Sequence, residues 1–486
     1  MARPALFAWD STRTSGMDYN ANKIKASEWI RLQQNIYDVG DYLTSTPYVF
    51  SATPATGDIF TSTFWNDAIT GISELSLYYT QPLPSVVSTG NRLMASYIEA
   101  IKDCINSADD IAITIMSFNT DQDLGWSGAS PSKTIWLPLI SLGTYNFIVD
   151  WGDGNSDTIT VYNQAERNHT YASIGTYTVT LTGTIIGWNF EGAGDCRKLL
   201  DIQEWGASFK LYDIALGRYF ENCWNLDITA TNSLDLTGNT NMRACFLENR
   251  TLASSGSINN MDVSSIEDFG NMFAYCDVFN SDITGWNTSS ALDMGGMFLE
   301  CFVFNQDISG WNVSNVTDMA LMFNGANAFN QNITAWDTSS VLDMSGMFSY
   351  NSGFDSYLLT LDTSSVTDMH SMFRNATTFD QDISFWNVSN VTDMSNMFNG
   401  ATMYNQSMAA WNITSVTDMT DMLKGCTLGL YNYDTLLVSW GGQAVQYGVV
   451  FSAGNSKYSG GGSPADLART HLIDVHGWTI TDGGVA

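Results

Sequence analysis

The central part of the chain repeats one pattern of hydrophobic and polar residues every 25 positions. The segment DISGWNVSNVTDMALMFNGANAFNQ (307–331) is followed by NITAWDTSSVLDMSGMFSYNSGFDS (332–356). A fixed period of this length is typical of a solenoid, in which each copy forms one rung and buries its hydrophobic edge against the next. The sequence therefore predicts a solenoid of 25-residue rungs over 256–428.

Within one copy, the hydrophobic positions predict a strand followed by a helical turn. Ile308, Trp311 and Val313 have the spacing of a leucine-rich-repeat strand, with Trp311 and Val313 pointing inward. The Met and Phe residues of 319–323 lie at i, i+3 and i+4, on one face of a helical turn. The inward Trp recurs in five copies and is replaced by Leu in a sixth: Trp286, Trp311, Trp336, Trp386, Trp411 and Leu361.

An aspartate before the Met-rich segment recurs seven times: Asp268, Asp293, Asp318, Asp343, Asp368, Asp393 and Asp418. Stacked carboxylates on neighbouring rungs would repel one another. Capping of the helical turn would give each carboxylate a backbone N–H partner, so we interpret this row as structural. A ladder of metal ions is the alternative, and the pattern offers no second ligand for it.

A second polar row lies between the inward positions of the predicted strand and is the candidate ligand-binding face. Its members are Asp262, Asn287, Asn312, Asp337, Asp362, Asn387 and Asn412. Short carboxylates and amides in a column can bond to sugar hydroxyls, or to the row's own backbone. Both interpretations stay open.

The rest of the chain differs from the repeats. Residues 1–110 contain three amphipathic helical patterns and predict either a small helical domain or an element that docks on a partner. Residues 111–190 alternate hydrophobic and polar positions between turn residues and predict a small β-sandwich. Residues 191–255 are interpreted as degenerate rungs that cap the solenoid at its N-terminal side, and 429–486 as its C-terminal cap.

The composition of the chain argues against several classes of function. The 486 residues have a formal net charge of −31, which disfavours nucleic acid and anionic membrane surfaces as partners. No apolar run reaches the length of about 18 residues that a membrane span requires. The seven cysteines form no CxxC pair, and those at Cys276, Cys301 and Cys426 share a register with alanines, so we expect small buried side chains there.

Catalytic chemistry finds little support in the sequence. The four histidines are His169, His370, His471 and His476, and no nucleophile motif accompanies them. His370 stands where other copies have Ala or Ser. Three aspartates near one turn (Asp150, Asp153 and Asp157) suggest a calcium loop, but turn chemistry is favoured because the ligand count is too low. We expect a protein that is not an enzyme and has no metal or cofactor.

Two stretches resemble known families. DWGDGNSDTITVYNQAERNHTYASIGTYTVTLTG (150–183) resembles the PKD-type immunoglobulin-like sandwich through Trp151, Gly152, Asp153, Gly154, His169, Tyr171, Gly175, Tyr177 and Val179. The repeats resemble those of the BspA-like bacterial surface proteins, a divergent leucine-rich-repeat group, as in FNQDISGWNVSNVTDMALMFNGA (304–326). These resemblances imply an adhesive role with binding partners, and they supply no catalytic residues.

The start MARPALFAWDSTRTSG lacks the basic and apolar regions of a secretory signal, unlike exported members of that group. This difference motivates a hypothesis: a bacteriophage virion protein (head or tail fibre, spike or decoration) assembled in the host cytoplasm. Residues 1–110 would contact virion proteins, and the solenoid would contact a host-surface glycan or protein. A bacterial cell-surface or secreted adhesin is the alternative, and a glycan depolymerase is less favoured. Homo-oligomerisation stays open.

Overall fold

The computed structural model describes residues 113–122, 125–126, 128–253 and 257–486. The chain divides into two compact units, and the second comprises Thr114–Trp205 and Phe209–Ala486. The helical domain predicted at 1–110 lies outside the described residues. The described part is β-rich with few helices, which agrees with the β-sandwich predicted at 111–190 but not with the α/β rungs, each with a helical turn, predicted at 256–428.

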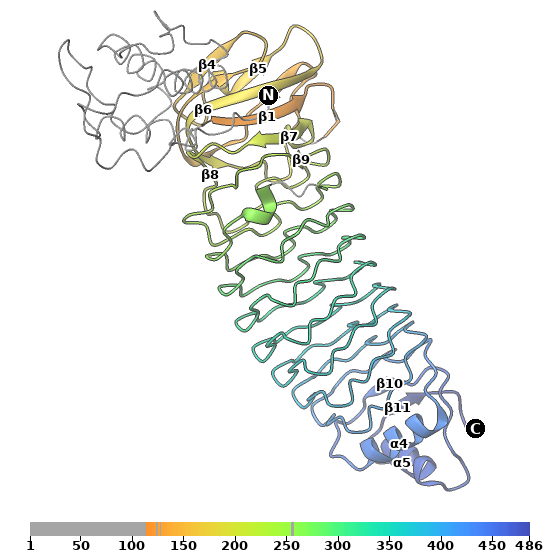
Figure 1. Ribbon diagram of the computed structural model, residues 1–486. Helices are drawn as coiled ribbons and strands as arrows, with labels where there is room; N and C mark the ends of the chain where they lie inside the picture. The colour runs from red at the N-terminus through yellow and green to blue at the C-terminus, as the bar shows by residue number, and fades with distance from the viewer. Residues whose placement is uncertain (1–112, 123–124, 127, 254–256) are drawn as a thin grey trace, which may run out of the picture. The chain divides into compact units, whose positions relative to one another are not determined.

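Two sheets form the first part of the second unit (Figure 1). The larger sheet has seven strands in the order β4-β3-β6-β1-β7-β9, with β8 paired to β6, and β2 pairs with β5 in the smaller one. The bounds are β1 Ile113–Asn119, β2 Thr134–Trp136, β3 Leu139–Asp150, β4 Ser156–Ile159, β5 Asn168–Thr170, β6 Thr176–Trp188, β7 Leu199–Glu204, β8 Phe209–Lys210 and β9 Asp227–Ile228, with 3-10 helices η4 Ala165–Arg167, η5 Cys196–Lys198 and η6 Ser257–Asn260.

Strand β3 shows how the alternating pattern forms this sheet. Tyr145, Phe147 and Val149 are buried, whereas Asn146 and Ile148 between them are exposed, because successive side chains point to opposite faces. The sheet continues past the predicted sandwich. β7 runs antiparallel to β1, and β9 runs parallel to β7. The segment interpreted as degenerate rungs is therefore joined to the sheet by backbone hydrogen bonds.

The repeats stack through parallel contacts between equivalent residues of successive copies (Figure 1). Each aspartate of the recurring row forms a β-bridge with the next one, 25 residues on, from Asp268 to Asp418. Beyond each bridge, alternate backbone N–H groups donate to the following copy: Met319 to Asp343 (3.0 Å), Leu321 to Ser345 (2.8 Å) and Phe323 to Met347 (2.9 Å). We call each copy between two bridges a rung.

The helical turn predicted at 319–323 is wrong. Met322 N–H bonds back to the Met319 carbonyl three residues earlier, while the Leu321 N–H between them donates to Ser345 of the next rung. Leu321 and Gly325 have left-handed backbone (φ 59° and 71°), which no α-helix contains. The segment is thus a chain of tight turns. Its Met and Phe side chains are nevertheless buried as the pattern predicts.

The strand predicted at 308–313 is also wrong as a strand, although its inward and outward positions are correct. Trp311 and Val313 are buried and Asn312 is exposed. The extended backbone is interrupted because Asp307 and Asn312 each accept the N–H two residues later, which closes a turn on either side of Trp311. The only bridge of this rung to the next lies at Asp318, among the described residues.

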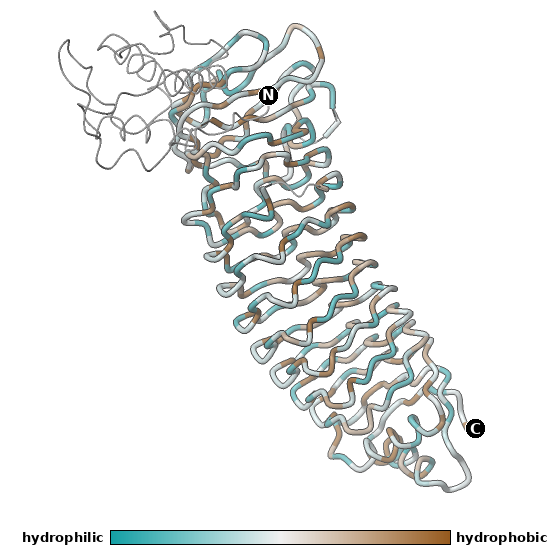
Figure 2. Tube along the Cα trace, in the orientation of Figure 1, coloured by the Kyte–Doolittle hydropathy of each residue, from teal (hydrophilic) through white to brown (hydrophobic). Residues whose placement is uncertain are grey.

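Aromatic side chains form continuous columns inside the rungs. Phe298 stacks on Phe304 of its own rung at 3.9 Å between ring centroids, and on Phe323 of the next rung at 5.8 Å. Trp286 and Trp311 stack at 6.2 Å. Figure 2 shows the hydrophobic and hydrophilic positions recurring from rung to rung. Every rung therefore buries the apolar edge of its neighbour, as in repeat proteins generally.

The C-terminal segment packs on the last rung. It contains α4 (Leu430–Gly441), α5 (Pro464–Asp474) and the parallel pair β10 (Val450–Ser452) and β11 (Thr479–Thr481). Met419 of the last rung forms a bridge with Phe451, and the Trp440 indole donates to the Met408 carbonyl at 3.3 Å. These contacts occupy backbone groups that another rung would otherwise bind.

Candidate functional site

The predicted ligand-binding row is exposed at all seven positions: Asp262, Asn287, Asn312, Asp337, Asp362, Asn387 and Asn412. In each residue, Oδ1 accepts the N–H of the residue two positions later, at 2.9–3.2 Å. The row, which we call the turn row, therefore lies on turns and not on a strand. Its regular geometry comes from local hydrogen bonds, so the column has a structural role whatever else it does.

The turn row retains capacity for a ligand. A turn of this kind uses one of the two polar atoms of each side chain, and the other faces water or a partner. Hydrogen bonds from Ser264 hold the pKa of Asp262 below its usual value, and those from Ser339 do the same for Asp337. The row thus combines three carboxylates with four neutral amides, which suits a polar ligand without negative charge.

An exposed apolar patch, which the sequence analysis missed, interrupts this polar surface. Tyr357, Leu359 and Phe385 are 69%, 47% and 76% exposed, and we call them the apolar patch. The Trp386 indole donates to the Leu358 carbonyl at 3.2 Å, which places the two segments side by side on neighbouring rungs. Aligning the copies would have found it, because equivalent positions are polar or small: Asp307, Asp382, Ser309, Ser384, Gly310 and Ala335.

The row of bridge aspartates, which we call the bridge row, also satisfies its carboxylates locally. Each Oδ1 accepts the N–H two residues later at 2.7–2.8 Å, as in Asp318 with Ala320. The N–H partner was predicted, but it belongs to a turn. Burial raises the pKa of Asp318, and the neighbouring carboxylates of Asp293 and Asp343 add to the rise. At Asp318, repulsion between stacked carboxylates therefore adds to the larger effect of burial.

The cysteines in register with alanine are buried, as predicted for small core side chains. Cys276 and Cys301 are fully buried and bond through Sγ to carbonyls of neighbouring rungs. Burial raises the pKa of both thiols, so they stay protonated at neutral pH. The same position holds Asn351, whose amide nitrogen donates to the Phe329 carbonyl at 3.1 Å. The side chains at this position therefore belong to the buried core of the rungs.

The aspartates near the WGDG turn all have local partners. Asp150 accepts the Gly152 N–H, Asp153 accepts from Asn155 and contacts His169 at 2.8 Å, and Asp157 accepts from the Trp151 indole. The His169 ring stacks on Trp151 at 4.9 Å. These contacts agree with turn chemistry, the interpretation favoured from the sequence.

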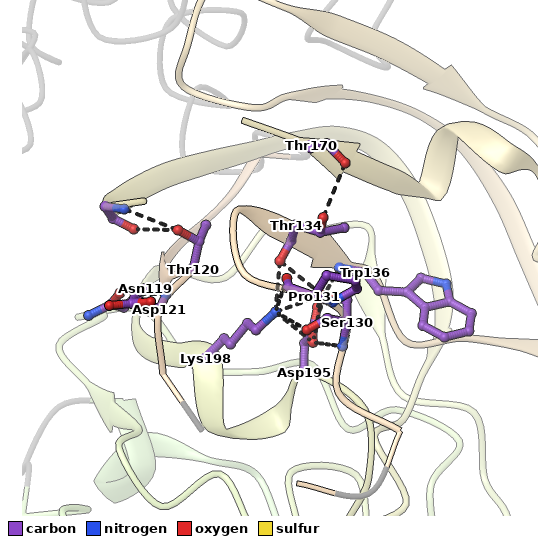
Figure 3. Close-up of polar contacts among 11 residues, drawn as sticks. Asn119, Thr120, Asp121, Ser130, Pro131, Thr134, Trp136, Thr170, Asp195 and Lys198 are labelled. Carbon is purple, nitrogen blue, oxygen red and sulfur yellow. Dashed lines mark hydrogen bonds and ion pairs between the residues drawn. The ribbon is translucent and has the colours of Figure 1, made fainter. Parts of the chain in front are cut away.

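A buried polar cluster joins the segment around β2 to the residues of η5, which directly precede β7 (Figure 3). Lys198, which is 1% exposed, donates to Ser130 Oγ at 2.7 Å and pairs with Asp195 at 3.2 Å. It also donates to the carbonyls of Ser130, Pro131 and Thr134. A serine–lysine catalytic pair needs a neutral lysine that accepts the serine proton. Here Lys198 is surrounded by acceptors and Ser130 donates to Asp195, so the cluster serves as a structural link.

An open groove of about 560 Å³ lies next to this cluster. Its lining includes Leu139, Tyr162 and Glu191, and the Arg167 guanidinium lies 4.5 Å from the centre of the Trp136 ring. Arg167 also donates to the Tyr162 carbonyl at 3.0 Å. The cation is therefore held against an aromatic face, an arrangement that stabilises the groove wall.

No helix among the described residues is long and apolar enough to cross a membrane.

Comparisons with known proteins add one similarity. Residues 214–336 and 322–435 match the family described as "Mycoplasma protein of unknown function, DUF285". Neither the curated proteins nor the solved structures gave a match. The matched residues are the stacked rungs, so this part of the chain is similar to a family whose function its description leaves open.

Proposed function

We propose that the chain is a non-enzymatic adhesion protein whose rungs form a solenoid that presents a polar surface to a ligand on a cell surface. In its most specific form it is a virion protein of a bacteriophage, in a head or tail fibre, spike or decoration, and the ligand is a host-surface glycan. In the alternative, the protein is displayed on a bacterial cell surface or secreted as an adhesin. Contacts with virion proteins through residues 1–110 belong to this proposal and lie outside the described residues.

One observation supports a display role above others: the exposed residues differ from rung to rung, whereas the buried residues recur. The buried Met position is occupied by Met272, Met297, Met322, Met347, Met372, Met397 and Met422. The exposed position of Phe385 is Gly, Gly, Ala, Thr, Phe and Ala in successive rungs. A core that tolerates changes on its surface lets single rungs acquire contacts with a ligand while the stack persists.

The apolar patch and the turn row together favour a glycan. The rings of Tyr357 and Phe385 offer flat apolar faces to the C–H side of a sugar ring, while carboxylates and amides nearby bind hydroxyls. The chain's net charge of −31 disfavours an anionic polysaccharide. A neutral glycan is therefore the ligand that these residues suit best.

Binding of full-length protein to host cells and to an array of neutral and acidic glycans tests the proposal. The double variant Tyr357→Asp, Phe385→Gly replaces the patch with residues that other rungs have, so we expect it to fold and to bind at least tenfold more weakly. The control, Leu292→Thr with Leu342→Thr, changes two other exposed side chains to the threonine of equivalent positions and should bind as the natural chain does. Equal binding by the patch variant contradicts the glycan assignment.

A separate experiment tests whether the protein belongs to a phage particle or to a bacterial cell surface. Mass spectrometry of purified phage particles, with immunogold electron microscopy of the full chain, should find the protein on the particle. Detection on intact bacterial cells that carry no phage would support the bacterial adhesin in its place. Release of reducing sugar ends from a bound glycan would show a depolymerase and overturn the non-enzymatic assignment.

A further inference from the structure

One column beside the bridge row contains two nitrogen-bearing side chains among small residues. It begins at Arg243, because Asn241 forms the bridge with Asp268 and Arg243 lies two residues later. The following rungs have Gly270, Gly295, Ala320, Ser345, His370, Ser395 and Thr420 at this position. His370 is therefore an exception placed directly beside a row of carboxylates.

Arg243 shows that a cation occupies the space between carboxylates of neighbouring rungs. Its Nη1 lies 3.2 Å from Asp268 Oδ1 and 2.8 Å from Asp293 Oδ2. Gly270 leaves room for it, since a Cβ there would lie 2.5 Å from Nη1. The row thus binds positive charge at its first two positions, and the pair of carboxylates on successive rungs is the unit that does so.

His370 lies beside a similar pair of carboxylates, Asp368 of its own rung and Asp393 of the next. Its Nδ1 lies 2.9 Å from Asp368 Oδ1, and one ligand atom from each of the three residues lies within 4.8 Å of the others. The imidazole and the Asp368 carboxylate are 45% and 34% exposed, so solvent ions reach them. A nitrogen lone pair this close to a carboxylate oxygen requires a proton or a metal ion between them.

We propose that Asp368, His370 and Asp393 bind one divalent transition-metal ion of the zinc class, with water completing its coordination. One imidazole nitrogen with carboxylate oxygens is a ligand set that zinc accepts, whereas calcium and magnesium prefer oxygen alone. Two ligands on one zinc lie roughly 3–3.4 Å apart at bond lengths near 2.1 Å, close to the spacing of His370 and Asp368. The ion links two rungs as Arg243 does.

Isothermal titration of the full-length, chelator-treated protein with Zn²⁺ tests this site, with Co²⁺ absorption as a second readout. We expect one zinc equivalent that His370→Ser removes or weakens at least tenfold. Serine occupies this position in neighbouring rungs, so the variant should keep its thermal stability without metal. Calcium and magnesium should not compete at equal concentration.

A transplanted site separates this proposal from binding elsewhere. Adding Ser395→His to His370→Ser places an imidazole beside Asp393 and Asp418, one rung further on, and should restore the zinc equivalent and the cobalt spectrum. Unchanged binding by His370→Ser would place the zinc elsewhere in the chain and overturn the proposal. So would a natural chain that binds no zinc at 1:1 stoichiometry, or one that binds calcium as tightly.

Discussion

The indole Nε1 of Trp311 donates a hydrogen bond to the carbonyl oxygen of Ile283, 3.1 Å away and 28 residues earlier. The same contact, at 3.0–3.2 Å, recurs for the other tryptophans of this position: Trp286 to Ile258, Trp336 to Ile308, Trp386 to Leu358 and Trp411 to Ile383. Each indole therefore contributes both stacking area and a backbone link between rungs. Leu361, at the equivalent position, can make no such bond.

Leu361→Trp should stabilise the chain. The new indole would donate to the Ile333 carbonyl, 28 residues earlier, for a gain of about 1 kcal/mol. Chemical denaturation followed by circular dichroism measures it. The control, Leu358→Trp, places the same ring at a fully buried position that other rungs fill with Ile or Met, and overpacking there should cost about 1–3 kcal/mol. A loss of stability in both variants would show that the Leu361 rung has repacked around the smaller side chain.

Leu321→Asn should also stabilise the chain, through the backbone. Leu321 has φ 59° and is 40% exposed, so its side chain gains little from burial while its backbone is strained. Asn271 and Asn396 occupy the same turn position, and asparagine tolerates this conformation. We expect a gain of about 0.5–1 kcal/mol. Thermal melts of the variant and the natural chain measure this gain. Leu292→Asn, at an exposed leucine without positive φ, is the control and should give no gain in stability.

The buried columns could be predicted from the sequence because repetition places equivalent residues on top of one another. Trp311, Met322 and Phe323 recur at one period, so their burial follows from the stacking alone. The local backbone could not be predicted in this way. Spacing of i, i+3 and i+4 is satisfied equally by a helical turn and by consecutive tight turns. The available signal was glycine at the left-handed positions, as at Gly325 and Gly346.

The candidate sites were predicted in part. The turn row was identified correctly as exposed, because it alternates with inward residues, yet its hydrogen bonds depend on turn geometry that the period does not specify. The sequence did not show that Arg243 and His370 both lie two residues after a bridging residue, and the reason is different. Asn241 and Asp268, which bridge, are 27 residues apart, so the first rung leaves the 25-residue register and Arg243 does not align with the later copies.

Asp318→Asn should raise stability at neutral pH. The folded chain holds the pKa of Asp318 above its unfolded value, mainly through burial and further through Asp293 and Asp343. The protonated form therefore favours the fold: this contribution is fully present below the unfolded pKa and is lost as pH rises through the folded one. Asparagine keeps an oxygen for the Ala320 N–H and removes the charge. Since Asp318 is partly exposed, solvent limits the gain to below about 1 kcal/mol.

The measurement for Asp318→Asn is the melting temperature from pH 4 to pH 8. The difference between the variant and the natural chain should grow with pH and shrink in high salt, which screens the carboxylates from one another. Asp337→Asn is the matched control, because hydrogen bonds from Ser339 hold the pKa of Asp337 below its usual value. Its carboxylate favours the fold above the unfolded pKa, so the control should lose stability at neutral pH, where Asp318→Asn gains.

Lys198→Met should destabilise the packing of the β2 segment against η5. The methionine fills the stem of the lysine but leaves Asp195, which is 1% exposed, as an uncompensated buried carboxylate. Removing one partner of a buried pair typically costs about 3–5 kcal/mol. Lys210→Met is the control: its pair with Asp235 is shorter, at 2.8 Å, but is about one-third exposed, and its loss should cost under about 1 kcal/mol. Denaturant titration compares the two, and hydrogen exchange should locate the early opening of Lys198→Met at residues 130–136. Equal costs at the two lysines would mean that water reaches the cluster of Figure 3 and that the cluster does not hold the β2 segment against η5.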